Sequence, residues 1–258
     1  AESHVDRSIA NAKSFIQTNV VGSYVLLEVA TRYWKDTLNS AEESFRFVHV
    51  STDEVYGALD DGEPPFTEET PYDPTSPYSA SKASSDHLVR AWHRTYGLPA
   101  MITHASNNYG PFQYPEKLIP LSIKNALDGK PIGIYGNGQQ IRDWLFVDDH
   151  VMALISVLYR GMAGQTYNIG GNAEIRNLDL IHRVCDILDD LVPVKERRCG
   201  GGHRQLISFV DDRAAHDFRY AIEISKIKQY LDWSPTESIE TGLYKTVSWY
   251  VSRHLAAG

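Results

Sequence analysis

The spacing of hydrophobic and polar positions predicts helices alternating with strands in the first part of the chain. Apolar residues recur at helical spacing over 15–34, and a short apolar strand follows at 45–50. A second helix is expected over 78–96, where Gly97 and Pro99 end it, and 100–103 has the composition of the next strand. This α-β-α-β order is typical of a parallel sheet.

Beyond residue 107 the pattern changes to shorter elements. Helices are predicted at 118–127, from Asp148 onward, and at 178–188, 225–231 and 239–252, with strands at 132–135 and 166–169. We therefore expect a sheet-based portion over 1–107 and a mixed α/β portion over 108–258. The second portion would supply another wall of a binding pocket, and some of its segments would return to the sheet.

Composition narrows the class of protein. The chain has 258 residues with 42% hydrophobic content, enough to bury a core, and its net charge of -8 argues against non-specific nucleic-acid binding. Two cysteines, Cys185 and Cys199, form no metal-binding or disulfide pattern. No apolar run reaches the roughly 20 residues of a membrane helix, and the first residues do not form a signal peptide. We expect no metal, no membrane association and a cytoplasmic location.

Chemically active side chains follow the strand at 45–50. Thr52, Asp53 and Glu54 would emerge at the carboxyl end of that strand, where open α/β sheets bind their ligands. Adjacent carboxyls can act as an acid and a base only when their environments separate their pKa values. The sequence leaves that separation open, and an exposed acidic turn is the alternative.

Tyr78 and Lys82 are four residues apart in the second predicted helix. They would share one helical face, and an ammonium beside a phenol is expected to lower the pKa of the phenol from about 10. Tyr78 would then serve as a base near neutral pH. The alternative for such a pair is an ordinary surface helix.

Taken together, these motifs resemble the extended short-chain dehydrogenase/reductase superfamily and, within it, the dTDP-glucose 4,6-dehydratases. The triplet Thr52-Asp53-Glu54 is the discriminating part, because related epimerases lack the adjacent Asp-Glu. The resemblance covers nearly the whole chain, with matching segments at 1–8, 52–54, Tyr78 with Lys82, 107–111, 115–120, 140–144 and 167–171.

The resemblance implies a reaction in three stages. Tyr78 would take the proton of the sugar 4-hydroxyl while NAD accepts hydride from C4. Glu54 would remove the C5 proton, Asp53 would protonate the departing 6-hydroxyl, and hydride would return to C6. Thr52 would bind the sugar hydroxyls, and Lys82 would bind the nicotinamide ribose.

Further binding residues and a partner are implied by the same resemblance. The expected cofactor contacts are Ser3, Thr18, Tyr78, Lys82 and Asn107. The expected contacts to dTDP-glucose or a related nucleotide sugar are His4, Thr52, Asn107, Lys117, Leu118, Tyr135, Arg142, Asn177, Arg213 and His216. Members of the family pair through two long helices, here over 13–34 and 79–96, so a homodimer is expected.

The resemblance implies a Rossmann-type doubly wound parallel sheet with a smaller mixed α/β substrate-binding portion. Relatives begin with a strand and a glycine-rich phosphate turn, and no G-x-G-x-x-G occurs in this sequence. We therefore expect a sheet that is incomplete at the amino terminus, and impaired binding of NAD by this chain alone. Two alternatives stay open: a related nucleotide-sugar epimerase or decarboxylase, and a non-catalytic fragment or interaction subunit.

Overall fold

A parallel sheet forms the centre of one half of the molecule. The computed structural model describes residues 1–38, 45–212, 214 and 216–257. Strand β1 (Phe47–Thr52) pairs in parallel with β2 (Ala100–Ala105), and β2 pairs in parallel with β6 (Thr166–Ile169). Strand β6 comes from the portion beyond residue 107, so that portion returns to the sheet.

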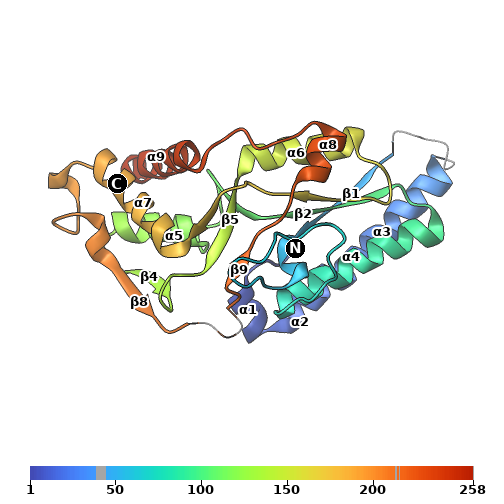
Figure 1. Cartoon of the computed structure of the whole chain (residues 1–258), viewed down its shortest axis with the longest axis horizontal. Coiled ribbons are helices and arrows are strands. Elements are labelled where there is room, and N and C mark those ends of the chain that lie inside the picture. The colour runs from blue at the N-terminus through green and yellow to red at the C-terminus, as the bar shows by residue number, and fades with distance from the viewer. Residues whose placement is uncertain (39–44, 213, 215, 258) are drawn as a thin grey trace.

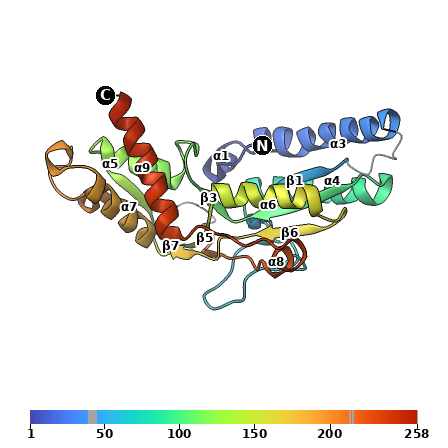
Figure 2. The ribbon, with the colours of Figure 1, turned by 90° about the horizontal axis from the view of Figure 1, so that it is seen from above.

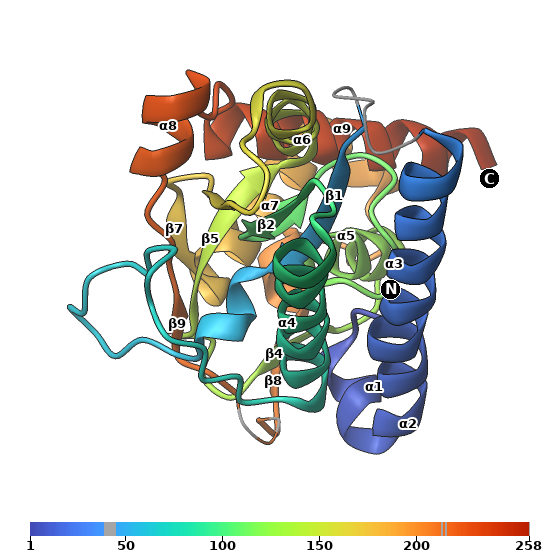
Figure 3. The same cartoon turned by 90° about the vertical axis from the view of Figure 1, so that its right-hand side faces the viewer.

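Helices cover both faces of this sheet (Figure 1). Figure 3 shows α6 (Val147–Arg160) on one side of β1 and β2 and α4 (Pro77–Tyr96) on the other. Beside α4 lies a continuous helical run made of α2 (Ala12–Phe15), η1 (Ile16–Val21), α3 (Gly22–Arg32) and η2 (Tyr33–Thr37), preceded by α1 (Val5–Ala10). Helices α3 and α8 (Ser225–Leu231) lie at opposite sides of the molecule (Figure 2).

Each face of the sheet has its own hydrophobic core. On the α4 side, Leu27, Val89 and Ile102 pack together, and on the α6 side Met101, Val157 and Ile227 do so. Alternate residues of a strand point to opposite faces, which explains why Met101 and Ile102 enter different cores. This two-layer covering is the arrangement expected for a parallel sheet.

The other half is built around strand β5 (Ile141–Phe146). This strand pairs with β3 (Asn107–Tyr109), β7 (Glu174–Arg176) and β9 (Arg219–Tyr220), and β4 (Ile132–Tyr135) pairs with β8 (Ile207–Val210). Helices α5 (Leu118–Leu127), α7 (Asn177–Leu191) and α9 (Ile239–Ala257) pack on these strands through a third core. In Figure 1, β5 lies between the two halves, so the surface where they meet is formed around it.

The predicted helices and strands are confirmed, but β3, β5, β7, β8 and β9 were not predicted from the sequence. Strand β5 is missing from the hydrophobic pattern because Arg142 and Asp143 interrupt it. Both are nevertheless buried, at 5% and 2% exposure, and their charged groups are hydrogen-bonded inside the protein. Among the described residues, no helix combines the length and the apolar character needed to cross a bilayer.

Candidate active site

The two adjacent carboxyls lie in a tight turn directly after β1. The strand ends at Thr52, and a 3-10 turn, η3 (Asp53–Tyr56), follows at its carboxyl end. Thr52 caps this turn, because its Oγ1 accepts a hydrogen bond of 3.3 Å from the backbone N–H of Glu54. The cap turns the chain so that Asp53 and Glu54 occupy different environments.

Asp53 is buried at 2% exposure, whereas Glu54 lines an open cavity. Burial raises the pKa of Asp53 well above its ordinary value, and the charges of Glu54 and Asp143 add to the rise. One oxygen of Asp53, Oδ2, has no hydrogen-bond partner among the described residues. Burial therefore favours the neutral acid form of Asp53, beside a second carboxyl that reaches the cavity.

Tyr78 and Lys82 lie in the first turns of α4, where a capping box formed by Ser76 and Ser79 starts the helix. The predicted lowering of the Tyr78 pKa is wrong for this structure. Burial and the charge of Glu54 raise the pKa of Tyr78, against a hydrogen bond with Thr52 that lowers it. Lys82 cannot offset the burial, because its Nζ donates instead to the Val50 carbonyl at 2.8 Å.

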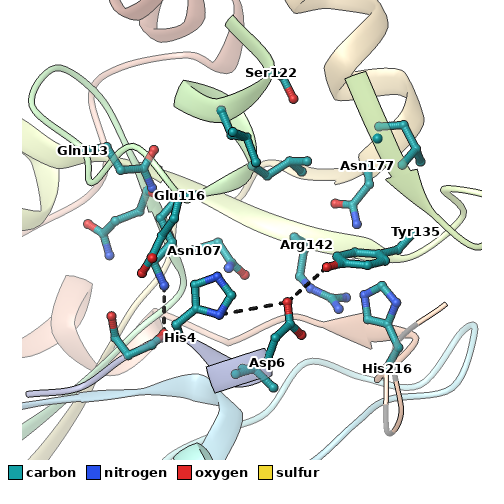
Figure 4. Close-up of a pocket in the computed structure, with 18 of the residues that line it drawn as sticks. His4, Asp6, Asn107, Gln113, Glu116, Ser122, Tyr135, Arg142, Asn177 and His216 are labelled. Carbon is teal, nitrogen blue, oxygen red and sulfur yellow. Dashed lines mark hydrogen bonds and ion pairs between the residues drawn. The ribbon is translucent and has the colours of Figure 1, made fainter. Parts of the chain in front are cut away.

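A cavity of about 590 Å³ opens beside these groups (Figure 4), within the usual size range of small-molecule sites. It lies between the amino-terminal residues, the first residues of β3, helix α5, and strands β4 and β5. Of the residues implied by the resemblance, it is lined by Ser3, His4, Glu54, Asn107, Lys117, Leu118, Tyr135, Arg142, Asn177 and His216.

Side chains from both halves meet across the cavity. Figure 4 shows His4 and Asp6 facing Tyr135 and Arg142, and the Tyr135 hydroxyl donates to Asp6 Oδ2 at 3.1 Å. The Tyr135 ring lies edge-on to His216, with centroids 6.0 Å apart. The Tyr135–Asp6 contact joins residues 129 positions apart, and His216 also lies far from Tyr135 in the sequence, so the cavity exists only in the folded chain.

The cavity wall offers polar atoms to a ligand. Within the part of the chain that the structure describes, Asn107 Oδ1 and Asn177 Oδ1 are buried without a hydrogen-bond partner. Buried acceptors in this state are costly unless a donor reaches them. A ligand that offers hydroxyl or N–H donors would satisfy these two acceptors.

Arg142 lies on the wall with its guanidinium held in place. It donates to the carbonyls of Asp217 and Phe218 at 2.9 and 3.2 Å and stacks over the Tyr220 ring at 4.4 Å. Lys117 donates to the Ser3 carbonyl at 2.7 Å across the cavity mouth. Two cations therefore border the cavity, as an anionic ligand requires.

Not every expected residue lies at the cavity. Thr52, Asp53, Tyr78 and Lys82 are buried beside it rather than lining it. Thr18 is exposed on η1, away from the cavity lining, and Arg213 lies outside the described residues.

Three acidic residues near the site were missed by sequence reasoning. Asp6 and Glu116 line the cavity, and the charge of Asp143 acts on Asp53. Asp143 follows Arg142 directly in a segment that the resemblance covers, which was the available signal. Its carboxylate accepts the backbone N–H groups of Gly171 and Ala173 at 3.0 and 2.7 Å, so it also joins β5 to the chain after β6.

Comparison of the sequence with protein families gives a match over residues 1–246 to the family described as GDP-mannose 4,6 dehydratase. A dTDP-glucose 4,6-dehydratase from Neisseria meningitidis is 57% identical over 97% of this chain and 70% of its own length. A dTDP-glucose 4,6-dehydratase from Haemophilus influenzae is also 57% identical, over 97% of this chain and 74% of its own length. The strong similarity thus extends through both halves.

Solved structures also match nearly the whole chain. The crystal structure of DesIV from Streptomyces venezuelae, a dTDP-glucose 4,6-dehydratase with NAD bound, matches with a TM-score of 0.87 and 44% identity, over 99% of this chain and 72% of that one. A UDP-glucose 4-epimerase from Thermotoga maritima matches with a TM-score of 0.83 and 25% identity, over 98% of this chain and 76% of that one. The fold is therefore the Rossmann-type α/β fold, as the sequence predicted.

Proposed function

This chain belongs to the GDP-mannose 4,6 dehydratase family, and on that premise we propose that it is an NAD-dependent dTDP-glucose 4,6-dehydratase. The product would be dTDP-4-keto-6-deoxyglucose. The observation that carries this proposal is the unequal pair of carboxyls: Asp53 has a raised pKa in the interior, and Glu54 faces the cavity. Loss of water needs one proton donor and one proton acceptor close together, and this pair supplies both.

The chain's own side chains would move the protons. Tyr78 accepts the proton of the sugar 4-hydroxyl as C4 is oxidised to a ketone, and the ketone acidifies the hydrogen on C5. This role requires the phenolate form, which the positive charge of NAD, when bound, would favour against the raised pKa of Tyr78. Glu54 removes that C5 proton, Asp53 donates its proton to the 6-hydroxyl, and water leaves as the C5–C6 double bond forms. Glu54 then returns a proton to C5 when C6 is reduced. NAD, when bound beside Tyr78 and Lys82, would supply the hydride chemistry at C4 and C6.

The residues present fit the nicotinamide end of this cofactor. The Lys82 ammonium and the Tyr78 hydroxyl are donors beside the carboxyl end of β1, suited to ribose hydroxyls, and Asn107 Oδ1 is a buried acceptor without a partner among the described residues. The sequence contains no G-x-G-x-x-G turn to bind the pyrophosphate. We therefore assign only the nicotinamide end to this chain's residues.

The nucleotide sugar would occupy the cavity. We place the diphosphate near Arg142 and Lys117, because their cations border the cavity and arginine matches phosphate oxygens with its planar fork. Asn107 and Asn177 would accept hydrogen bonds from hydroxyl or base N–H groups, and Tyr135 would pack against the nucleoside. The glucose would then lie next to Glu54.

The test is mass spectrometry of dTDP-glucose incubated with the chain and NAD. A nucleotide-sugar product lighter by one water is expected. A product of unchanged mass with an inverted sugar hydroxyl would instead identify an epimerase. Absence of any product from a chain that binds dTDP-glucose in calorimetry would refute the proposed activity for this chain.

We also propose that the protein forms a homodimer through α3 and α4. Large apolar side chains are exposed along the helical run, including Val25 at 49%, Leu26 at 62% and Val29 at 57%. The run packs beside α4, where Tyr24 meets Trp92 edge-on at 5.9 Å. Two such helices from each copy would cover this apolar surface in a four-helix contact.

Val29→Glu is expected to convert the dimer to a monomer, because a charge buried in a helix contact would lack a partner. Analytical ultracentrifugation measures the change directly. Tyr159→Glu is the matched control, since Tyr159 is 75% exposed on α6, on the other face of the sheet, and this variant should remain a dimer. A monomeric wild-type protein would rule out the proposed contact.

We place the activity in the cytoplasm. Cys185 and Cys199 are both free thiols in the structure, and Cys185 is buried. A chain with unpaired thiols fits a reducing compartment. Fractionation of expressing cells, with the water-loss assay on each fraction, tests this location.

A further inference from the structure

A buried hydrogen-bond network lies behind the turn that contains Asp53 and Glu54. Its centre is the imidazole of His104 on β2, which is 0% exposed. His104 Nδ1 lies 2.6 Å from the Tyr56 hydroxyl, and Nε2 lies 3.1 Å from Asp86 Oδ2 and 2.9 Å from the Tyr72 hydroxyl. None of these residues takes part in the mechanism described above.

The network holds the turn at both of its ends. Tyr56 is the last residue of η3, and its hydroxyl contacts His104. Ser51 precedes Thr52, and its Oγ donates to Asp86 Oδ2 at 3.0 Å. Since His104 contacts both Tyr56 and Asp86, one ring joins the two ends of the segment that contains Thr52, Asp53 and Glu54.

The network also connects the turn to helix α4. Asp86 lies on α4, one helical turn beyond Lys82 and two beyond Tyr78. Hydrogen bonds and charges from His104 and His49 outweigh the effect of burial and keep the pKa of Asp86 below its usual range. The segment with the carboxyl pair and the helix with Tyr78 are therefore joined through a buried carboxylate.

The position of the protons follows from the partners of Tyr56. Its hydroxyl donates to Asn168 Oδ1 at 2.9 Å, and Asn168 uses its amide nitrogen to donate to the Phe66 carbonyl at 3.1 Å. The single hydroxyl proton is thus used, and the Tyr56 oxygen must accept from His104. We therefore assign the hydrogen of this contact to His104 Nδ1, which then donates to Tyr56.

We propose that His104 is a positioning residue for the water-loss step. By donating to Tyr56 from β2 it fixes η3 against the sheet, so that Asp53 and Glu54 keep one spacing to Tyr78 that is matched to C4, C5 and C6 of the sugar. This inference rests on the proposed dehydratase function. A displacement of about 1 Å in such a group can lower a rate roughly a hundredfold.

Two substitutions separate positioning from simple packing. Asparagine places an amide N–H near the position of Nδ1 and keeps the donor to Tyr56, whereas glutamine reaches toward the position of Nε2 and loses it. Asparagine is the smaller side chain and leaves the larger cavity, so packing alone makes H104N the more damaging change. Positioning makes H104Q the more damaging one for catalysis.

The expected result is a kcat about 10 to 100 times lower in H104Q, with KM for dTDP-glucose within about threefold of wild type, and a kcat near wild type in H104N. The thermal midpoint of unfolding should fall further in H104N than in H104Q. Tyr56→Phe should lower kcat at least as much as H104Q, because it also removes the hydrogen bond to Asn168. The double variant should show no loss of kcat beyond that of Tyr56→Phe, since both changes remove the His104–Tyr56 hydrogen bond. Equal losses of kcat in H104N and H104Q, or additive losses of kcat in the double variant, would overturn the proposal.

A second readout does not depend on turnover. Hydrogen–deuterium exchange of peptides that contain residues 53–56 should rise several-fold in H104Q and Y56F and stay unchanged in H104N, while peptides of α5 and α7 stay unchanged in all three. If the wild type does not dehydrate dTDP-glucose, this exchange pattern still tests the anchoring. Unchanged exchange in H104Q, or faster exchange in H104N than in H104Q, would overturn it.

Discussion

Glu54→Gln is expected to stop the loss of water while leaving the oxidation at C4 possible. Glu54 is the carboxyl that lines the cavity, and glutamine has nearly the same shape but accepts no proton. Removing a general base of this kind typically lowers a rate about 10² to 10⁴ times. The kcat for water loss should fall within that range, and the KM for dTDP-glucose should change little.

Solvent deuterium makes this prediction specific to the C5 proton. In heavy water the wild-type product should contain one deuterium at C5, and the sugar recovered from Glu54→Gln should contain none there. The appearance of reduced nicotinamide absorbance in a single turnover should persist in the variant. Glu69→Gln is the matched control, since Glu69 is exposed on the loop between η3 and α4 and does not line the cavity. Water loss at the wild-type rate in Glu54→Gln would remove Glu54 from its proposed role.

Asp53→Asn is expected to impair catalysis and to stabilise the fold at the same time. The variant lacks the acid that protonates the 6-hydroxyl, so kcat should fall about 10² to 10⁴ times. In the wild type this proton must be present on Asp53, so the rate of water loss should decline as the pH rises through its raised pKa. The asparagine side chain does not titrate, so the residual rate of the variant should not show this decline.

The stability change has a definite sign. Because the pKa of Asp53 is raised in the folded protein, the native state binds more protons than the unfolded state above about pH 4, where an ordinary aspartate ionises. The free energy of unfolding of the wild type therefore falls as the pH rises from about 4 through the raised pKa. The amide introduced by Asp53→Asn cannot ionise, so the advantage of the variant should be absent below about pH 4 and grow above it.

Differential scanning calorimetry of wild type and Asp53→Asn between about pH 4 and pH 8 measures this advantage. For a chain of this size, each kcal/mol gained should raise the thermal midpoint by about 2–4 °C. A lower midpoint in the variant at neutral pH would mean that Asp53 is ionised and paired in the fold. It would then be unsuitable as the acid.

How much could be predicted from the sequence differed between the two halves. In the first half, β1 and β2 each begin with a short, mainly apolar run, and Gly97 and Pro99 mark the end of α4, so local patterns placed them within a few residues. In the second half, β5 contains Arg142 and Asp143, and no local pattern marks it as a strand. Its charged residues are buried because backbone groups from distant segments bind them, and such partners are invisible along the chain.

The sequence by itself determined the chemistry that is available: two adjacent carboxyls after a strand, a Tyr–Lys pair four residues apart on a helix, and motifs that identify the family. These features depend only on residue identity and on short spacings. Only the tertiary structure decided how the groups are tuned. It buries Asp53 near Asp143 and raises its pKa, turns Lys82 toward the Val50 carbonyl, and joins Ser51, Tyr56 and Asp86 through His104. Burial and long-range hydrogen bonds set these properties, because they arise between residues that the chain brings together only when it folds.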